Sequence, residues 1–336
     1  MPESVSRMKL QQRLLGRSDL KVPCLGFGGG PIGNANIATD DALEAVSAAF
    51  DSGLRYFDTA PLYGLGRSEI RLGRALGSRR RESYVLATKV GRLLIHADPP
   101  TGADEAAIRY DYSYDGAMRS FATSLARAEL DRIDIVLIHD IDRWTHGEGQ
   151  AEMFRAAVGG AFRALAELRE QGAVRAIGVG LNDSDIAERA IREMDLDVVL
   201  LAGRYTLLEQ GALKGFLPEC VRRSVSVVIG GPYNSGILAT GPIAGALYNY
   251  APAPPAVVER ARQIEAVCRY HCVPLAAAAL QFPLHHPAVA TIVPGLSSVA
   301  EVERTLQLFR KKVPSAFWRD LKTERLLAVD APVGTD

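Results

Sequence analysis

The sequence has few cysteines, no recognisable metal-ligand spacing and no disulfide framework. Its 336 residues include four cysteines, Cys24, Cys220, Cys268 and Cys272. So few cysteines argue against a chain stapled by disulfides, and Cys268 and Cys272 lack further ligands at metal-binding spacing. We therefore expect no bound metal, and we expect the thiols to be reduced and buried.

The sequence also lacks an excess of charge of either sign and any long apolar run. The 39 Lys+Arg residues balance the 39 Asp+Glu residues, which argues against nucleic acid or an anionic membrane as a partner. No apolar stretch approaches the roughly 20 residues of a membrane-spanning helix, and the first 20 residues have no secretory-type apolar core. We therefore expect a cytoplasmic globular protein; no pattern in the chain indicates an oligomeric state.

Short apolar runs typical of strands alternate with amphipathic stretches typical of helices along the chain. Predicted strands occupy residues 24–28, 56–58, 84–88, 133–138, 176–179, 198–201, 225–229 and 290–293. Predicted helices occupy residues 40–51, 68–76, 114–129, 154–169, 184–194, 257–270 and 299–308. Eight units without a linker predict an α/β protein with one domain over residues 1–336, a (β/α)8 TIM barrel. An open doubly wound sheet is the alternative.

Three segments fall outside a minimal barrel. Residues 11–22 predict a short N-terminal hairpin that caps the bottom of the barrel. Residues 91–113 and 230–255 follow the third and seventh strands as long βα loops, and barrel enzymes place substrate-binding loops at these positions.

A glycine motif after the first strand resembles the fingerprint of dinucleotide-binding folds. Gly28, Gly30 and Gly33 in GGGPIG satisfy G-x-G-x-x-G. In that fold a helix begins within the motif and directs its N-terminus at pyrophosphate, whereas here Pro31 interrupts the motif and the helical pattern begins near Thr39. We therefore interpret the motif as a glycine-rich loop over a barrel mouth.

Four residues with catalytic potential stand at or just beyond the ends of consecutive predicted strands. FDTAPLYG contains Asp58 and Tyr63, LATK contains Lys89, and IVLIHD contains His139. Singly, each has a structural interpretation: a loop cap, a packed ring, a solvated lysine or a core histidine. Because consecutive strand ends converge at one mouth of a barrel, their joint occurrence predicts a catalytic site.

On these motifs the chain resembles the aldo-keto reductase superfamily, most specifically in GLRYFDTAPLYGLGRSEIRLGRAL, VLATKVG and DIVLIHD. The resemblance implies a barrel that binds a nicotinamide cofactor in extended form, with Asp58, Tyr63, Lys89 and His139 as the catalytic tetrad. Tyr63 would exchange a proton with the substrate oxygen, and Lys89, held by Asp58, would lower the tyrosine pKa. His139 would orient the same oxygen. Tyr63, His139 and Trp144 are the expected substrate contacts.

The resemblance also implies a cofactor site, although three usual contacts are replaced. Gly180 and Leu181 stand where many relatives have Ser-Asn, Ala202 stands where glutamine is usual, and Gly230 replaces a stacking tyrosine. Asn182 is the candidate residue for binding the amide group of the nicotinamide. The other expected cofactor residues are Gly28, Pro232, Tyr233, Asn234, Ser235, Gly236, Leu238, Gly295, Ser297 and Glu301.

Two of these residues bear on the choice between NAD and NADP. Ser297 stands where NADPH-preferring relatives commonly place a basic residue, and serine cannot clamp a 2′-phosphate as arginine does. The Glu301 carboxylate can accept hydrogen bonds from ribose hydroxyls but repels a phosphate. The sequence therefore predicts NAD, with NADP left possible because Arg304 is close by in sequence.

The runs GVGLND, LLAGRYTLLEQ and GGPYNSGIL resemble one branch of the superfamily, whose members dehydrogenate L-fucose and other D-threo-aldoses, L-galactose or pyridoxal. These reactions share the oxidation of a cyclic hemiacetal to a lactone. We expect an aldose first and pyridoxal, giving 4-pyridoxolactone, second. A general NADPH-dependent aldehyde reductase and a non-enzymatic redox-sensing subunit are the remaining alternatives.

The loops at 93–113, 141–147 and 233–250 are expected to select the substrate. Within them, Asp142 and Arg143 could bind ring hydroxyls or form a solvated pair. Tyr233, Tyr248 and Tyr250 could line the pocket or pack their own loop.

Overall fold

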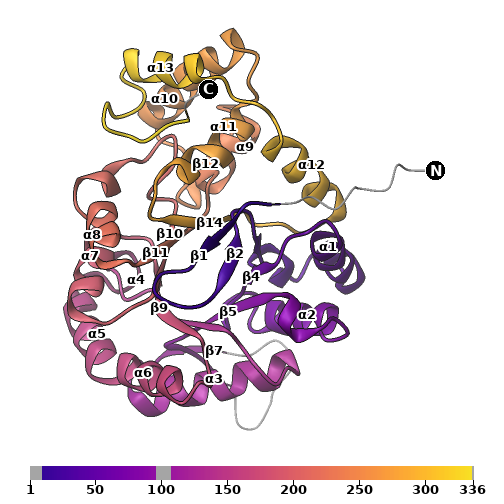
Figure 1. The fold of residues 1–336 in the computed structure, drawn as a ribbon, viewed down its shortest axis with the longest axis vertical. Coiled ribbons are helices and arrows are strands. Elements are labelled where there is room, and N and C mark those ends of the chain that lie inside the picture. The colour runs from indigo at the N-terminus through magenta and orange to yellow at the C-terminus, as the bar shows by residue number, and fades with distance from the viewer. Residues whose placement is uncertain (1–9, 96–106, 335–336) are drawn as a thin grey trace.

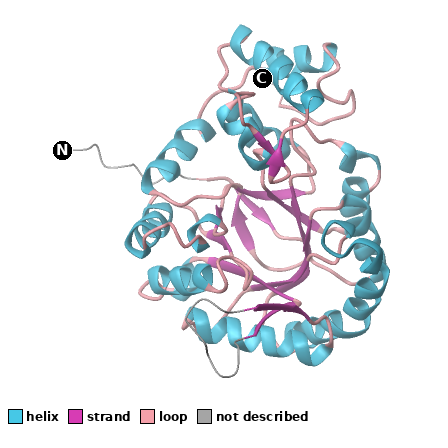
Figure 2. Ribbon diagram, turned by 180° about the vertical axis from the view of Figure 1, so that it is seen from behind, coloured by secondary structure: helices cyan, strands magenta, loops and turns pink. Residues whose placement is uncertain are grey.

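The computed structural model describes residues 10–95 and 107–334, and its centre is a parallel sheet closed into a barrel (Figures 1 and 2). The eight strands are β3 (Phe27–Gly28), β4 (Tyr56–Asp58), β5 (Val85–Val90), β8 (Ile135–His139), β9 (Ala176–Leu181), β10 (Val198–Ala202), β11 (Ser226–Gly230) and β14 (Val289–Val293). They pair in parallel in this order, and the parallel bridges Leu25–Ile292 and Gly28–Gly295 join β3 to β14. The (β/α)8 prediction is confirmed.

Helices surround the strands on the outside, as Figure 2 shows. Those that follow the barrel strands are α1 (Thr39–Asp51), α2 (Arg67–Leu76), α3 (Tyr114–Ala128), α5 (Gln150–Ala156), α6 (Phe162–Glu170), α7 (Ser184–Glu193), α8 (Phe216–Arg223), α11 (Leu275–Gln281) and α12 (Val299–Phe309). The others are α4 (Arg143–His146), α9 (Ile237–Thr240), α10 (Pro255–Tyr270) and α13 (Ser315–Thr323). Within residues 10–95 and 107–334, no helix is long and apolar enough to span a membrane.

The side-chain alternation of the strands determines what reaches the barrel mouth. Inward residues such as Val85, Ala87, Ile135 and Leu137 form an apolar cluster inside the barrel. Successive strand residues point to opposite faces, so every second residue of a strand faces the inside of the barrel. At the barrel mouth, the last inward-facing residue is polar on three neighbouring strands and small on the next three. These strand-end residues are Asp58, Lys89 and His139, then Gly180, Ala202 and Gly230.

The predicted N-terminal hairpin covers the opposite end of the barrel and lies in front of the strands in Figure 1. It consists of β1 (Gln12–Leu14) and β2 (Lys21–Pro23), and its Leu15 and Leu20 pack on the inward apolar cluster. Gly16 in its turn has a φ of +58°, and a Cβ there would lie 2.1 Å from the Asp197 carbonyl oxygen. Only glycine therefore fits the turn that seats the hairpin.

The two long segments at the barrel mouth contain strands of their own. β6 (Arg92–Ile95) and β7 (Ala107–Tyr110) form an antiparallel hairpin after β5, and residues 96–106 of the expected substrate loop lie outside the described residues. After β11, the chain passes through α9 and a second short hairpin, β12 (Leu247–Tyr248) and β13 (Ala251–Pro252). Each hairpin follows the carboxyl end of a barrel strand.

Several details differ from the sequence-based predictions. The predicted helix 154–169 is divided by a π turn, Ala157–Ala161, where the Ala161 amide donates to the Tyr112 carbonyl at 2.8 Å. The helices α8, α11 and α13 were not predicted. Cys24, Cys220 and Cys268 are buried and reduced as expected, but Cys272 is exposed, so that part of the cysteine prediction is wrong.

A buried aspartate at the bottom of the barrel provides a test of the fold. The fully buried Asp134 carboxylate pairs with Arg81 at 2.6 Å and Arg132 at 3.2 Å, and accepts a hydrogen bond from the Leu86 amide. Asp134→Ala leaves the Leu86 amide without this acceptor and removes the carboxylate from both arginines, so the free energy of unfolding in urea should fall by about 3 kcal/mol. Glu193→Ala, which breaks an exposed pair with Arg189, should cost less than about 1 kcal/mol. Equal costs for the two variants would contradict this role for Asp134.

Candidate active site

The four tetrad residues meet at the barrel mouth around the Lys89 ammonium. Its Nζ donates to Asp58 Oδ2 at 2.8 Å, to the Thr59 carbonyl at 2.8 Å and to the Tyr63 hydroxyl at 3.2 Å. The Lys89 side chain is 1% exposed and that of Asp58 is 4% exposed. A lysine so fully buried needs these acceptors, and Asp58 thereby fixes the ammonium beside the phenol.

The turn after β4 brings Tyr63 back over the strand ends. The Tyr63 amide donates to the Ala60 carbonyl, and the next residue, Gly64, has a φ of +62°. A Cβ on Gly64 would lie 1.8 Å from the Gly33 carbonyl oxygen, so the turn needs glycine to pack on the glycine-rich first loop. The Tyr63 ring then stands edge-on to His139, with 6.1 Å between ring centroids.

Burial and neighbouring charges determine the protonation states of these groups. Burial raises the pKa of Tyr63 to about 12, although the Lys89 ammonium acts to lower it. The expected lowering by Lys89 is therefore present but smaller than the effect of burial. Burial, reinforced by Lys89 and Arg92, places the pKa of His139 well below its usual range. Near neutral pH the site thus holds a neutral imidazole and a protonated phenol beside a lysine.

A cavity of about 220 Å³ opens over the tetrad. Its lining includes Tyr63, Lys89, His139, Gly180 and Asn182. The ring of Trp144, 60% exposed, and Tyr250, 81% exposed, also line it. All three residues expected to touch substrate, Tyr63, His139 and Trp144, therefore face one cavity.

The three positions at which usual cofactor contacts are replaced lie at the mouth, where neighbouring barrel strands end in small residues. Gly180 and Ala202 line the cavity, and a Cβ on Gly230 would meet the Leu200 and Ala202 side chains. The space beside Gly30 and Gly236 is open, since no heavy atom lies within 4 Å of a Cβ built on either residue. At the mouth, the small residues Gly180 and Ala202 leave room for a flat ring such as a nicotinamide.

The segment from Pro232 to Leu238 is held tightly beside that mouth. Asn234, Ser235 and Gly236 have φ values of 45°, 60° and 110°, and the Asn234 side chain bonds Thr206 and the Gly203 carbonyl. The side chains of Asn234 and Leu238 are buried, so they anchor the loop to the rest of the protein. Burial raises the pKa of Tyr233 to about 12, with Arg304 acting to lower it.

The residues expected to bind the adenosine part of the cofactor lie at the end of β14. Gly28 and Gly295 are bridged, which joins the glycine-rich loop to this end of the barrel. Glu301 Oε2 accepts hydrogen bonds from the Ser297 amide at 2.7 Å and the Ser297 hydroxyl at 2.9 Å. Glu301 is exposed on the first turn of α12, so its carboxylate is available to a nucleotide while it also holds Ser297.

The structure corrects the interpretation of one loop residue and separates the loop tyrosines. Asp142 is fully buried and caps α4 by accepting from the Thr145 amide, while its other oxygen accepts from the Asn182 amide. It is therefore a structural residue and not a ligand for ring hydroxyls. Arg143 pairs with Asp183 on the exposed surface. Tyr248 bonds Glu209, whereas Tyr250 lines the cavity.

Two charged residues of the cavity were missed by sequence reasoning. Arg92, at the start of β6, and Asp140, directly after β8, form an ion pair with an N–O distance of 2.5 Å. Arg92 directly follows the Lys89–Val90–Gly91 run and Asp140 directly follows His139, so their positions beyond the strand ends could have marked them. The pairing itself joins residues 48 positions apart and is visible only in the fold.

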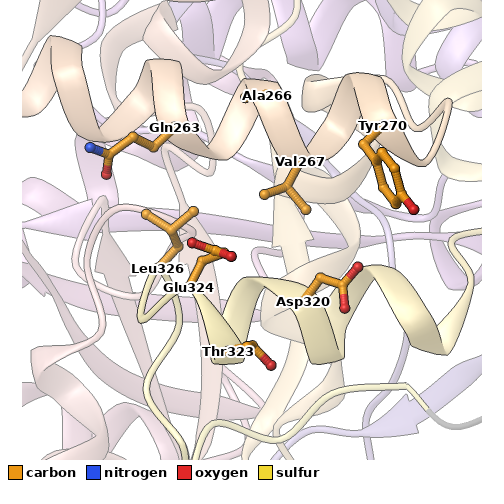
Figure 3. Close-up of a pocket in the computed structure, with 8 residues that line it drawn as sticks. All are labelled: Gln263, Ala266, Val267, Tyr270, Asp320, Thr323, Glu324 and Leu326. Carbon is orange, nitrogen blue, oxygen red and sulfur yellow. The ribbon is translucent and has the colours of Figure 1, made fainter.

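A larger cavity, of about 540 Å³, lies elsewhere. Figure 3 shows it between α10 and α13, with Gln263 and Val267 on one helix facing Asp320 and Thr323 on the other. Both helices stand outside the barrel in Figure 1, and the lining includes none of the tetrad residues. We therefore place the reaction at the smaller cavity, where the titratable groups converge.

Comparisons with known proteins identify the family of the chain. The aldo/keto reductase family model matches residues 24–323. The chain is 40% identical to pyridoxal 4-dehydrogenase of Microbacterium luteolum, over 95% of this chain and 98% of that protein. It is 39% identical to D-threo-aldose 1-dehydrogenase of a Pseudomonas species, over 92% and 95% of the two chains.

A solved structure agrees as well. The aldo-keto reductase AKR11C1 of Bacillus halodurans in its holo form superposes with a TM-score of 0.73 at 26% identity, covering 96% of this chain and 98% of that one. The family match extends over most of the chain and includes all four tetrad residues. The chain therefore belongs to the aldo/keto reductase family and is an NAD(P)-dependent oxidoreductase.

Proposed function

We propose that this protein oxidises the cyclic hemiacetal of an aldose of the L-fucose, D-threo-aldose or L-galactose type to a lactone, with NAD as hydride acceptor. The observation that carries the proposal is the Tyr63 hydroxyl, 3.2 Å from Lys89 Nζ, in one cavity with a neutral His139. A phenol beside an ammonium can exchange a proton with a substrate hydroxyl. The aldose is supported by the relative named for D-threo-aldose.

The reaction divides into a proton transfer and a hydride transfer. When bound, an oxidised nicotinamide supplies the hydride acceptor. The hemiacetal carbon loses its hydrogen as hydride, and its hydroxyl loses a proton to the ionised oxygen of Tyr63. The remaining C–O bond becomes the lactone carbonyl, and no water is consumed because the ring is already closed. His139 donates a hydrogen bond to the reacting oxygen, and Lys89 stabilises the phenolate before the proton arrives.

The neutral state of His139 suits this role. Burial keeps the imidazole uncharged, so it can donate a hydrogen bond without supplying a proton in competition with Tyr63. Its ring lies edge-on to the Tyr63 ring, so the two groups are close enough to contact the same substrate oxygen. We assign proton exchange to Tyr63, positioning of the oxygen to His139, and stabilisation of the phenolate to Lys89 held by Asp58.

Pyridoxal is the second candidate, because the relative named for it is as similar to this chain as the D-threo-aldose enzyme. Pyridoxal also closes to a hemiacetal, and its ring could stack on Trp144 at the cavity rim. NADH formation with L-fucose and with pyridoxal at equal concentrations, with products identified by mass, separates the two. A lactone from L-fucose supports the proposal, and a lactone from pyridoxal alone replaces the aldose. Turnover only with open-chain aldehydes and NADPH would indicate a general aldehyde reductase.

We predict that kcat/KM is higher with NAD than with NADP. The exposed Glu301 carboxylate would repel a 2′-phosphate, and Ser297 offers no cation to bind it. Glu301→Gln keeps a hydrogen-bonding oxygen for Ser297 and removes the charge. We expect kcat/KM for NADP to rise about fivefold, the equivalent of about 1 kcal/mol of surface repulsion.

Glu303→Gln on the same helix is the matched control, because it makes the same charge change at an exposed position that the cofactor assignment does not include. It should leave the ratio of NAD to NADP activity within about twofold. A wild-type kcat/KM for NADP equal to or above that for NAD would show that the cofactor preference is assigned wrongly.

A further inference from the structure

A buried ion pair that the proposed mechanism does not use lies beside the tetrad. Arg92 NH2 is 2.5 Å from Asp140 Oδ2, and the two side chains are 12% and 8% exposed. Both residues line the cavity that contains Tyr63 and His139. Removing two charges from water is costly unless their remaining polar atoms also find partners. The desolvation free energy of the pair is therefore high for an interaction that only links β6 to the barrel.

The backbone at Asp140 is held in a left-handed conformation that directs the carboxylate inward. Its φ is 50°, a region that non-glycine residues rarely adopt, although aspartate tolerates it better than most. Two contacts fix the turn: the Asp140 amide donates to the Gly180 carbonyl, and the Tyr112 hydroxyl donates to the carbonyls of His139 and Asp140. As a result Asp140 Oδ2 lies 3.2 Å from His139 Nε2.

Within the described residues, the pair retains an unsatisfied donor. Arg92 Nε is buried and has no hydrogen-bond partner, although Arg92 NH2 contacts both Asp140 and Thr145. A buried N–H without a partner costs free energy, so the pair is not optimised as a purely structural link. The cavity wall thus offers a carboxylate acceptor and a guanidinium donor side by side, next to the imidazole that holds the reacting oxygen.

We propose that Arg92 and Asp140 select the substrate by binding the hydroxyl on the carbon next to the hemiacetal carbon. This inference rests on the proposed function and extends it to a second substrate group. Vicinal oxygens of a sugar ring lie about one hydrogen-bond length apart, which matches the separation of Asp140 Oδ2 from His139 Nε2. A hydroxyl can donate to the carboxylate and accept from the guanidinium at once.

The same arrangement discriminates between the two candidate substrates. An ionised phenol, as beside the aldehyde carbon of pyridoxal, can only accept hydrogen bonds, so it gains from Arg92 but is repelled by Asp140. A neutral aliphatic hydroxyl uses both residues. The pair therefore favours an aldose that carries a hydroxyl at its second carbon over pyridoxal and over deoxy sugars.

The experiment compares L-fucose with 2-deoxy-L-fucose in the wild type and in Arg92→Met. We expect the wild type to prefer L-fucose by about tenfold to a hundredfold in kcat/KM, the range for a hydrogen bond to a charged group. In Arg92→Met the preference should fall to within about threefold, mainly through a higher KM for L-fucose, while the deoxy sugar keeps most of its kcat/KM. Asp140→Asn, which preserves shape and tolerates the left-handed φ, should reduce the preference similarly.

Arg109→Met is the matched control, because Arg109 belongs to the same β6–β7 hairpin but is half-exposed and pairs with Asp111 outside the cavity. It should leave the preference unchanged. Equal losses with both sugars in Arg92→Met and Asp140→Asn would show that the pair only supports the fold, and this inference would be wrong while the proposed function stands. Absence of a lactone from any sugar in the wild type would overturn both.

Discussion

Tyr63→Phe is expected to lower kcat for hemiacetal oxidation by at least about a hundredfold, the usual contribution of a positioned acid–base group. The phenyl ring keeps its packing against His139, but no atom remains to accept the proton of the substrate hydroxyl. Cofactor binding does not require the hydroxyl, so the dissociation constant for NADH, followed by fluorescence, should change little. The measurement is kcat under saturating conditions in which a deuterium label at the hemiacetal carbon slows turnover.

Tyr270→Phe removes the same atom from a ring that is 81% exposed on α10. Tyr270 does not line the cavity over the tetrad, so this variant should retain wild-type activity. Wild-type turnover by Tyr63→Phe, with hydride transfer still rate-limiting, would show that another group takes the proton.

Lys89→Met is expected to have an effect of similar size, because it raises the pKa of Tyr63 and lowers the ionised fraction of the phenol at each pH. The pKa of Tyr63 is about 12 even with the lysine present, and Lys89 acts to lower it. Oxidation needs the ionised tyrosine, so wild-type kcat for oxidation should rise with pH through the alkaline range below that pKa. Removing the ammonium should raise the pKa by about one to three units, and kcat at pH 8 should fall about tenfold to a thousandfold.

Reduction in the opposite direction uses the protonated phenol and should depend less on the lysine near neutral pH. Because Asp58 would be left buried and unpaired in Lys89→Met, the double variant Asp58→Asn/Lys89→Met serves as the folding control. Both variants should be slow, and their residual oxidation should increase steeply with pH. A Lys89→Met enzyme that oxidises the substrate at the wild-type rate at pH 8 would contradict the assignment of Lys89 to the tyrosine.

The barrel could be predicted because each strand is a short apolar run that is recognisable from a few consecutive residues. Strands such as Val198–Ala202 are apolar on both faces, and the polar residues of the tetrad stand where these runs end. α11 escaped prediction for a local reason. All of its residues except Gln281 are buried, so the segment LAAAALQ has no amphipathic period.

The four tetrad residues could be predicted from the sequence, but the charged residues of the cavity wall could not. Three neighbouring barrel strands end in the inward-facing residues Asp58, Lys89 and His139. The strand order alone therefore brings these residues together. Arg92 reaches Asp140 only because a hairpin and a left-handed residue redirect both side chains. The pKa of Tyr63 likewise depends on burial, which the sequence motif does not report.

The most direct test of hemiacetal oxidation is the mass of the first product formed from L-fucose and NAD in water enriched in oxygen-18, sampled within the first turnovers. Oxidation of the closed ring forms the lactone with no oxygen from solvent, so we predict an unlabelled lactone that appears together with NADH. An acid carrying solvent oxygen as the first product would show that an open-chain hydrate is oxidised instead, and would contradict this account.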